Sequence, residues 1–207
     1  MFWNIKKPAM IFLLLLSIGL NAQEFTNSND ILKQDEQYGI FEIGPYYPLA
    51  FGDNSANNAF DQKVGGGFSF MANLFESPFL LGFHGSFFKA EVTSQPLVGQ
   101  YDRTTSFVIA PIVGYHFLRH HKWQGTIRFS AGYVRYNNRS TNFKFHDSGT
   151  SLSFTPTFSY HFTKSWGLYL SSSYRHDFLN ISTSDSFNSD LNSLDYVSFS
   201  LGVRLVI

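Results

Sequence analysis

The sequence predicts an all-β chain that forms an eight-stranded antiparallel up-and-down barrel crossing a membrane. Two features of composition and one repeated pattern support this prediction. Charged residues make up 14% of the 207-residue chain and aromatic residues 18%, whereas ordinary soluble domains carry about 25% charged residues. Few charges and many aromatics, without a long apolar run in the body of the chain, favour a surface that faces something less polar than water.

The repeated pattern is clearest between Ser151 and Phe162. Every even position in this stretch is apolar or aromatic, and every odd position is Ser, Thr or His. A period of two predicts a β-strand with two different faces. The apolar face is dominated by large aromatics and the polar face is small and uncharged, which is typical of a strand with lipid outside and a hydrogen-bonded lumen inside.

Seven other segments repeat this alternation. The predicted strands are Tyr38–Leu49, Val64–Phe75, Phe79–Val92, Thr104–Leu118, Trp123–Tyr136, Ser151–Phe162, Ser165–Asp177 and Leu194–Ile207. Long polar connections at 52–58, 93–103, 137–149 and 179–193 alternate with short turns at 76–78, 119–122 and 163–164. Outer-membrane barrels have long outer loops and short periplasmic turns, and an even strand number lets the sheet close without an edge.

Two segments precede the first predicted strand. Lys6 and Lys7, then the apolar residues 9–20, then Ala22 predict a secretory signal peptide over residues 1–22 with cleavage after Ala22. The apolar run is too short to span a membrane as a helix, and an uncleaved anchor is the alternative. Residues 23–37 are read as a polar periplasmic lead-in, and residues 38–207 as the outer-membrane barrel domain.

Three stretches carry a resemblance to a known family: residues 41–49, 78–82 and 197–207. They resemble the small eight-stranded outer-membrane barrels of Gram-negative bacteria, the class that includes the transmembrane domain of outer membrane protein A, and look like barrel domains widespread in Bacteroidetes. The resemblance covers residues 38–207 and the signal peptide. It implies a monomer in the cell outer membrane, contact with its lipids and lipopolysaccharide, and insertion by the barrel assembly machinery. The chain departs from the family in ending on Ile207, where an aromatic residue is common.

Aromatic residues gather near both ends of the predicted strands. Those expected to form girdles at the two membrane interfaces are Phe79, Phe117, Trp123, Phe162 and Trp166 at the turn ends, and Tyr133 and Tyr174 toward the loop ends. Aromatic belts at both interfaces are typical of transmembrane barrels.

The alternation also places charged and polar side chains inside the barrel. The inward candidates are Glu42, His84, Arg128, Arg175, Asp177 and Arg204. Because an eight-stranded barrel is only wide enough for its own side chains, we expect these residues to plug the lumen as ion pairs. Glu42 and Arg204 are expected to pair, since the first and last strands meet on closure. Pro45, Pro111 and Pro156 lie within strands and predict bulges there.

The predicted function is structural or in surface interaction, without catalysis. The alternatives are a narrow pore, a lipid A-modifying enzyme and a soluble lipocalin-like binder. His176 faces outward near the loop end, but Asp177 points the other way, so no acid completes a catalytic set. His120 and His121 lack a third metal ligand. With no cysteine and zero net charge, no cofactor, metal or nucleic-acid partner is expected.

Overall fold

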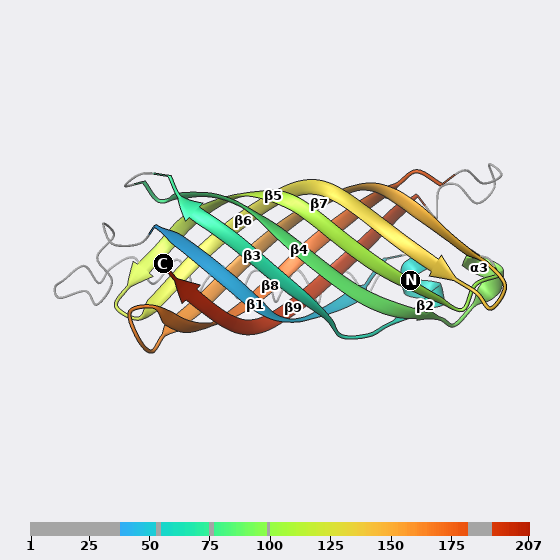
Figure 1. Ribbon diagram of the computed structural model, residues 1–207, viewed down its shortest axis with the longest axis horizontal. Helices are drawn as coiled ribbons and strands as arrows, with labels where there is room; N and C mark the ends of the chain where they lie inside the picture. The colour runs from blue at the N-terminus through green and yellow to red at the C-terminus, as the bar shows by residue number, and fades with distance from the viewer. Residues whose placement is uncertain (1–37, 53–54, 75–76, 99, 182–191) are drawn as a thin grey trace, which may run out of the picture. The chain divides into compact units, whose positions relative to one another are not determined.

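The computed structural model describes residues 38–52, 55–74, 77–98, 100–181 and 192–207, which form a closed antiparallel β-barrel (Figure 1). The strands are β1 Gly39–Ala50, β2 Phe60–Gln62, β3 Gly65–Asn73, β4 Phe79–Val92, β5 Arg103–His120, β6 Trp123–Arg139, β7 Lys144–His161, β8 Trp166–Leu179 and β9 Ser193–Val206. Two short helices, α2 Ser55–Ala59 and α3 Gln95–Val98, lie in the connections. The predicted signal peptide 1–22 and lead-in 23–37 fall outside the described residues.

The nine strands occupy eight positions in the barrel wall, because β2 and β3 share one position. Both pair with β4, and the Lys63 N–H between them donates to the Lys89 carbonyl at 2.8 Å. The strand order β2-β4-β3-β1-β9-β8-β7-β6-β5 closes through the pairing of β4 with β5. The predicted eight-stranded antiparallel barrel is therefore confirmed. Among the described residues, no helix is long and apolar enough to cross a membrane.

The three strand prolines do not produce the expected bulges, so that prediction is wrong. The pairing register is the same before and after Pro45, Pro111 and Pro156. Each proline pairs with one neighbouring strand, while pairing with the other neighbour skips two positions. Each proline lacks one backbone N–H, and that N–H would point to only one of the two neighbouring strands. The lost hydrogen bond therefore affects pairing with that one strand. A shift in pairing register between β5 and β6 lies instead between His116 and Leu118.

One long connection expected from the sequence is mostly strand. β6 continues to Arg139 and β7 begins at Lys144, and Asn137 pairs with His146, so the predicted loop 137–149 shrinks to four residues. The polar sequence misled here because a strand that extends beyond lipid into water needs no apolar face. Nearby, the connection before β5 packs Tyr101 between Phe60 and Phe145, with ring centroids 6.3 and 5.4 Å apart, and burial raises the pKa of the Tyr101 hydroxyl.

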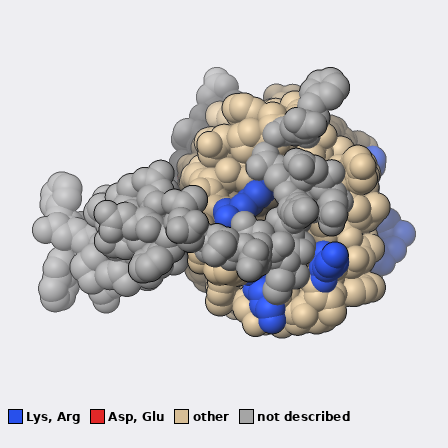
Figure 2. Space-filling model, turned by 90° about the vertical axis from the view of Figure 1, so that its left-hand side faces the viewer, with Lys and Arg blue, Asp and Glu red and all other residues tan. Residues whose placement is uncertain are grey.

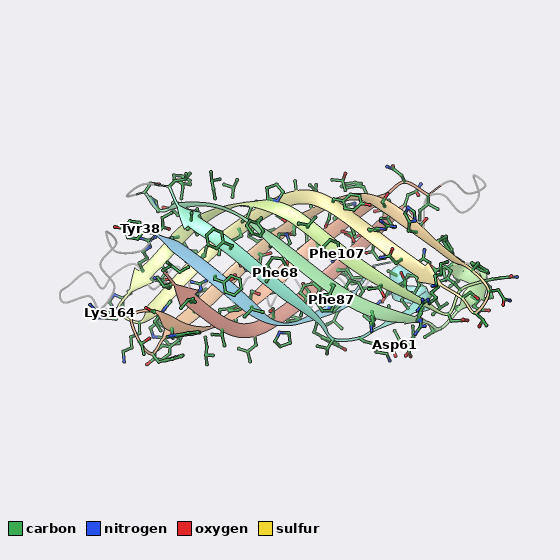
Figure 3. The ribbon with its side chains drawn as sticks, in the orientation of Figure 1. Tyr38, Asp61, Phe68, Phe87, Phe107 and Lys164 are labelled. Atoms are coloured by element: carbon green, nitrogen blue, oxygen red, sulfur yellow. The ribbon has the colours of Figure 1, made fainter. Side chains whose placement is uncertain are left out.

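Between the two ends of the barrel, the outer wall is apolar on every strand except the short β2. Phe68, Phe87 and Phe107 project from β3, β4 and β5, between the end marked by Tyr38 and Lys164 and the end marked by Asp61 (Figure 3). Soluble monomers rarely expose continuous apolar surfaces of this kind. A lipocalin-like binder needs its apolar faces inside, so the arrangement contradicts that alternative.

The two ends of the barrel differ in their connections. The turn end carries the short β3–β4, β5–β6 and β7–β8 connections, and the loop end is the opposite one. Figure 2 looks onto the turn end and shows Lys or Arg side chains both near the centre of the barrel and at its rim.

Candidate functional site

The lumen near the turn end is built around one carboxylate, Glu42 of β1. In register, Glu42 lies between Ser69 of β3 and Arg204 of β9. Arg204 donates from Nε to Glu42 Oε1 at 2.9 Å and from Nη2 to the same oxygen at 2.5 Å. Its Nη1 reaches Gln124 Oε1 at 3.2 Å. The structure thus places an ion pair where closure of β1 on β9 brings the two residues together.

A second arginine reaches Glu42 from the opposite wall. Arg128 belongs to β6, which lies four strands from β1 in either direction. Its Nη1 donates to Glu42 Oε2 at 2.5 Å and to Ser69 Oγ at 3.1 Å, and its Nη2 donates to Thr157 Oγ1 at 2.7 Å. Ser69 donates to Oε2 at 2.9 Å. We call Glu42, Ser69, Arg128, Thr157 and Arg204 the turn-end cluster; its hydrogen bonds run across the whole lumen.

A different cluster fills the lumen near the loop end. Arg175 and Asp177 are inward neighbours on β8, and Arg175 Nη2 donates to Asp177 Oδ2 at 2.6 Å. The same Nη2 reaches Tyr136 Oη at 2.9 Å, and Tyr136 in turn donates to Asp177 Oδ2 at 2.5 Å. The guanidinium also lies over two rings, 4.8 Å from the Tyr196 centroid and 5.4 Å from that of Phe88. We call these five residues the loop-end cluster.

Between the two clusters lies a cavity of about 80 Å³, lined mainly by hydroxyl side chains. Glu42 and Arg128 line it from one side and Arg175 from the other. His84 is placed here, with Nε2 3.0 Å from Ser130 Oγ. A cavity of this size and polarity has room for a few water molecules, but it is bounded by a cluster at either end.

The aromatic residues expected in the girdles all lie on the outer wall. Phe79, Trp123, Tyr133, Phe162, Trp166 and Tyr174 are exposed. Phe117 is half-buried, because its ring packs edge-on against Phe158 with centroids 5.5 Å apart, at the register shift in β5. Several others pair across strands, such as Trp123 with Tyr160 at 4.9 Å.

Sequence reasoning missed one polar cluster on the outer wall at the loop end. His176 Nδ1 lies 2.7 Å from Asp195 Oδ1, and its Nε2 lies 3.2 Å from Ser193 Oγ. Tyr174 donates to the same Asp195 oxygen at 2.7 Å. The expectation that no acid accompanies His176 is wrong, because the acid comes from β9 in register with it. The signal available was the outward spacing of Ser193 and Asp195 on the last strand.

The residues that the structure describes include no group of three His, Asp or Glu side chains that could hold a metal ion. The inward histidines bond to hydroxyls instead. His116 Nδ1 lies 3.3 Å from Thr126 Oγ1, and His161 Nε2 lies 3.3 Å from Ser159 Oγ. Their contacts are those of packed lumen residues.

Solved structures share the fold of this barrel. The barrel is similar to Neisserial surface protein A, with a TM-score of 0.60 and 12% identity over 82% of this chain and 97% of that one. It is also similar to the outer membrane protein OprG from Pseudomonas aeruginosa, with a TM-score of 0.55 and 12% identity over 84% and 98%. No family model and no curated protein matches the chain. At this identity the likeness concerns the fold alone, which is that of the small eight-stranded outer-membrane barrels.

Proposed function

We propose that the protein is an integral outer-membrane barrel with a structural or surface-interaction role, and that its lumen does not conduct. The observation that carries this proposal is the inside-out distribution of polarity: buried ion pairs fill the lumen while aromatic and aliphatic side chains cover the wall. Only a lipid environment makes such a wall favourable, and closure satisfies the backbone groups that lipid cannot.

The narrow pore is less well supported. A conducting path would have to pass both the turn-end and the loop-end cluster, whose charged side chains are at most 7% exposed. The cavity between the two clusters is bounded by Glu42 and Arg128 on one side and by Arg175 on the other. Moving these groups aside would break buried charge pairs, which is costly.

The proposal is tested on the outer-membrane fraction and then in liposomes. We expect the unboiled protein to migrate faster than the boiled one on a gel, and proteoliposomes to retain small solutes as well as protein-free liposomes do. A soluble protein without a gel shift would overturn the membrane assignment. A folded protein that releases solutes would leave the membrane assignment in place and make the pore the better function.

The same proposal includes the maturation and surroundings of the chain. We infer that residues 1–22 are removed as a signal peptide, that the barrel assembly machinery inserts a monomer, and that outer-membrane lipids and lipopolysaccharide surround it. The resemblance of the strand sequences favours a Bacteroidetes-type barrel. N-terminal sequencing of the mature protein is expected to find Gln23 as the first residue. A chain that still begins at Met1 would contradict cleavage.

A second candidate is hydrolysis of an acyl ester in an outer-leaflet lipid. The observation that favours it is the hydrogen-bonded set of Ser193, His176 and Asp195 beside exposed Tyr174. In such a set the Ser193 hydroxyl attacks the ester carbonyl, and His176 takes its proton and passes it to the departing alcohol. Water then releases the acyl group from Ser193 as a carboxylic acid.

Lipid A mass after overexpression tests this candidate. We expect loss of one acyl chain with the unaltered protein, and no loss with Ser193→Ala. Ser172→Ala is the matched control, because Ser172 lies on the same strand face as His176, and it is expected to keep the activity. An unchanged lipid A mass with the unaltered protein would exclude this activity on lipid A.

A further inference from the structure

Three basic side chains lie side by side on the outer wall beyond the loop-end aromatics. Arg103 of β5 is directly opposite Arg139 of β6, and Arg139 is directly opposite Lys144 of β7. All three are exposed on the outer wall of neighbouring strands. Like charges directly opposite each other in a sheet are destabilising. The row therefore has an electrostatic cost that an anion between the side chains would offset.

Two more cations extend this row toward the apolar wall. Lys89 of β4 is in register with Thr105, and Arg135 of β6 is in register with Phe107. These side chains line a hollow of about 470 Å³ on the outer wall. We call Lys89, Arg103, Arg135, Arg139 and Lys144 the basic patch.

Nearby acidic side chains do not neutralise the basic patch. Within the described parts of the chain, none of its five residues forms an ion pair. Glu91 lies in register with Arg103 but forms its ion pair with Lys63, at 3.4 Å. The Asp102 carboxylate accepts a hydrogen bond from Gln95 at 3.2 Å. The polar contact of Arg135 is with the Asn137 amide oxygen, at 3.0 Å.

The basic patch begins at the height of the lipid headgroups and continues above them. Arg135 follows exposed Tyr133 by two residues and Arg139 follows it by six, whereas Arg103 precedes exposed Phe107 by four. At about 3.3 Å per residue and a tilt of roughly 40°, these steps rise about 5, 15 and 10 Å above the aromatics. Interfacial aromatics mark the edge of the hydrocarbon, and the headgroup layer is about 5–8 Å thick on each side.

The patch is confined to one sector of the barrel. On the opposite sector, near the loop end, β8 and β9 present His176 and the acidic Asp195. Within the sector of the patch, exposed Glu91 of β4 and Asp61 of β2 both pair with Lys63. The cations of the patch lie on β4, β5, β6 and β7, next to the wall of β4 and β5 where Phe87 and Phe107 face outward (Figure 3). That wall offers an apolar surface for chains attached to a bound headgroup.

We propose that the basic patch binds the phosphate groups of a phosphorylated lipid headgroup in the outer leaflet. This inference rests on the membrane location proposed above. Arg103, Arg135 and Arg139 supply planar forks that match phosphate oxygens, and the two lysines add point charges. The exposed phenylalanines just below the patch are positioned to contact the acyl chains of the same lipid, which free phosphate lacks.

The full chain, reconstituted in nanodiscs, provides the test. The discs contain phosphatidylcholine alone, or with added bisphosphorylated lipid A, or with the same lipid A after removal of its phosphates. The readout is the temperature at which the fast-migrating gel band disappears. We expect phosphorylated lipid A to raise this temperature by several degrees and the dephosphorylated form to raise it much less.

The variant Arg139→Gln with Lys144→Gln is expected to lose most of this phosphate-dependent rise. In phosphatidylcholine alone it should be at least as stable as the unaltered chain, because the like charges have been removed. The matched control is Lys122→Gln with Lys164→Gln, a half-buried and an exposed cation at the turn end, which should keep the full rise.

Four outcomes would overturn the inference or the proposed membrane barrel on which it rests. Equal stabilisation by phosphorylated and dephosphorylated lipid A, or an unchanged response of the double variant, would show that the patch does not read phosphate. If inorganic phosphate alone gave the same rise, the ligand would be a free anion and not a lipid. A chain that never inserts or shows a heat-dependent gel shift would instead refute the proposed membrane barrel.

Discussion

The turn-end and loop-end clusters both bury arginine and a carboxylate in the lumen, but they stabilise the charges differently. At the turn end Glu42 holds two arginines, Arg128 and Arg204, which carry one more formal positive charge than the carboxylate compensates. At the loop end Arg175 and Asp177 balance each other, and the guanidinium also lies over two aromatic rings. The turn-end cluster depends on one acid, whereas the loop-end cluster has a second source of stabilisation.

The hydrogen-bond inventories support this distinction. Within the described residues, Arg175 leaves Nε and Nη1 without a protein hydrogen-bond partner, and Asp177 leaves Oδ1 without one. In the turn-end cluster the corresponding atom is Arg128 Nε alone. Glu42 instead accepts bonds on both oxygens, from Arg204, Arg128 and Ser69. The difference teaches that a buried arginine and carboxylate can be stabilised either by many hydrogen bonds or by neighbouring aromatic rings, according to the residues around them.

Replacing Glu42 should therefore have the largest effect on stability. Glu42→Gln leaves two buried arginines facing each other without an anion. Loss of one partner from a buried charge pair costs about 3–5 kcal/mol, and we expect a loss of that size in the free energy of unfolding. Denaturant titration of the folded protein, followed by the gel shift, measures it.

Glu91→Gln is the control for this substitution, because Glu91 is exposed and its partner Lys63 is also partly solvated. Its effect should stay within about 0.5 kcal/mol. If Glu42→Gln were as mild as Glu91→Gln, the turn-end cluster would not hold the barrel together in the way its hydrogen bonds suggest.

Asp177→Asn should destabilise less, although Asp177 is as deeply buried as Glu42. Arg175 loses its anion but keeps the Tyr136 hydroxyl and the faces of Phe88 and Tyr196. A desolvated cation–π contact is worth up to about 2 kcal/mol, so we expect a net loss of about 2 kcal/mol by the same titration. A loss equal to that of Glu42→Gln would show that the rings contribute nothing.

Sequence reasoning reached the strands and their inward faces because lipid and lumen impose opposite polarity on alternate residues. Closure of the first strand on the last was enough to bring Glu42 and Arg204 together. The sequence alone could not assign Arg128 as a partner of Glu42, because a contact across the lumen depends on the stagger of strands four positions apart. The two rings beside Arg175 were also not predicted. Phe88 and Tyr196 face the lumen together with the polar residues, whereas the alternation predicts that aromatic residues face the lipid.

The wrong predictions concern segments in which the polarity of a residue does not indicate its place in the barrel. Residues 137–149 are polar because they extend past the lipid, although most of them continue β6 and β7. The prolines looked incompatible with a closed ladder, yet Pro45 keeps its register with Gly66 on one side. Asp195 was not predicted to be a partner of His176, because the pairing register of two neighbouring strands cannot be derived from the sequence of either strand alone.

The smallest expected effect separates the ring of Tyr196 from its hydroxyl. Tyr196→Phe keeps the ring 4.8 Å from the Arg175 guanidinium and removes one hydrogen bond, the 3.2 Å contact between the Tyr196 and Tyr136 hydroxyls. A net hydrogen bond is worth about 0.5–1.5 kcal/mol, and Tyr136 still donates to Asp177, so the loss should lie at the lower end of that range. Tyr196→Leu removes the ring as well and should cost more by denaturant titration. Equal losses for the two variants would mean that the loop-end cluster is held by its hydroxyls, like the turn-end cluster, and not by its rings.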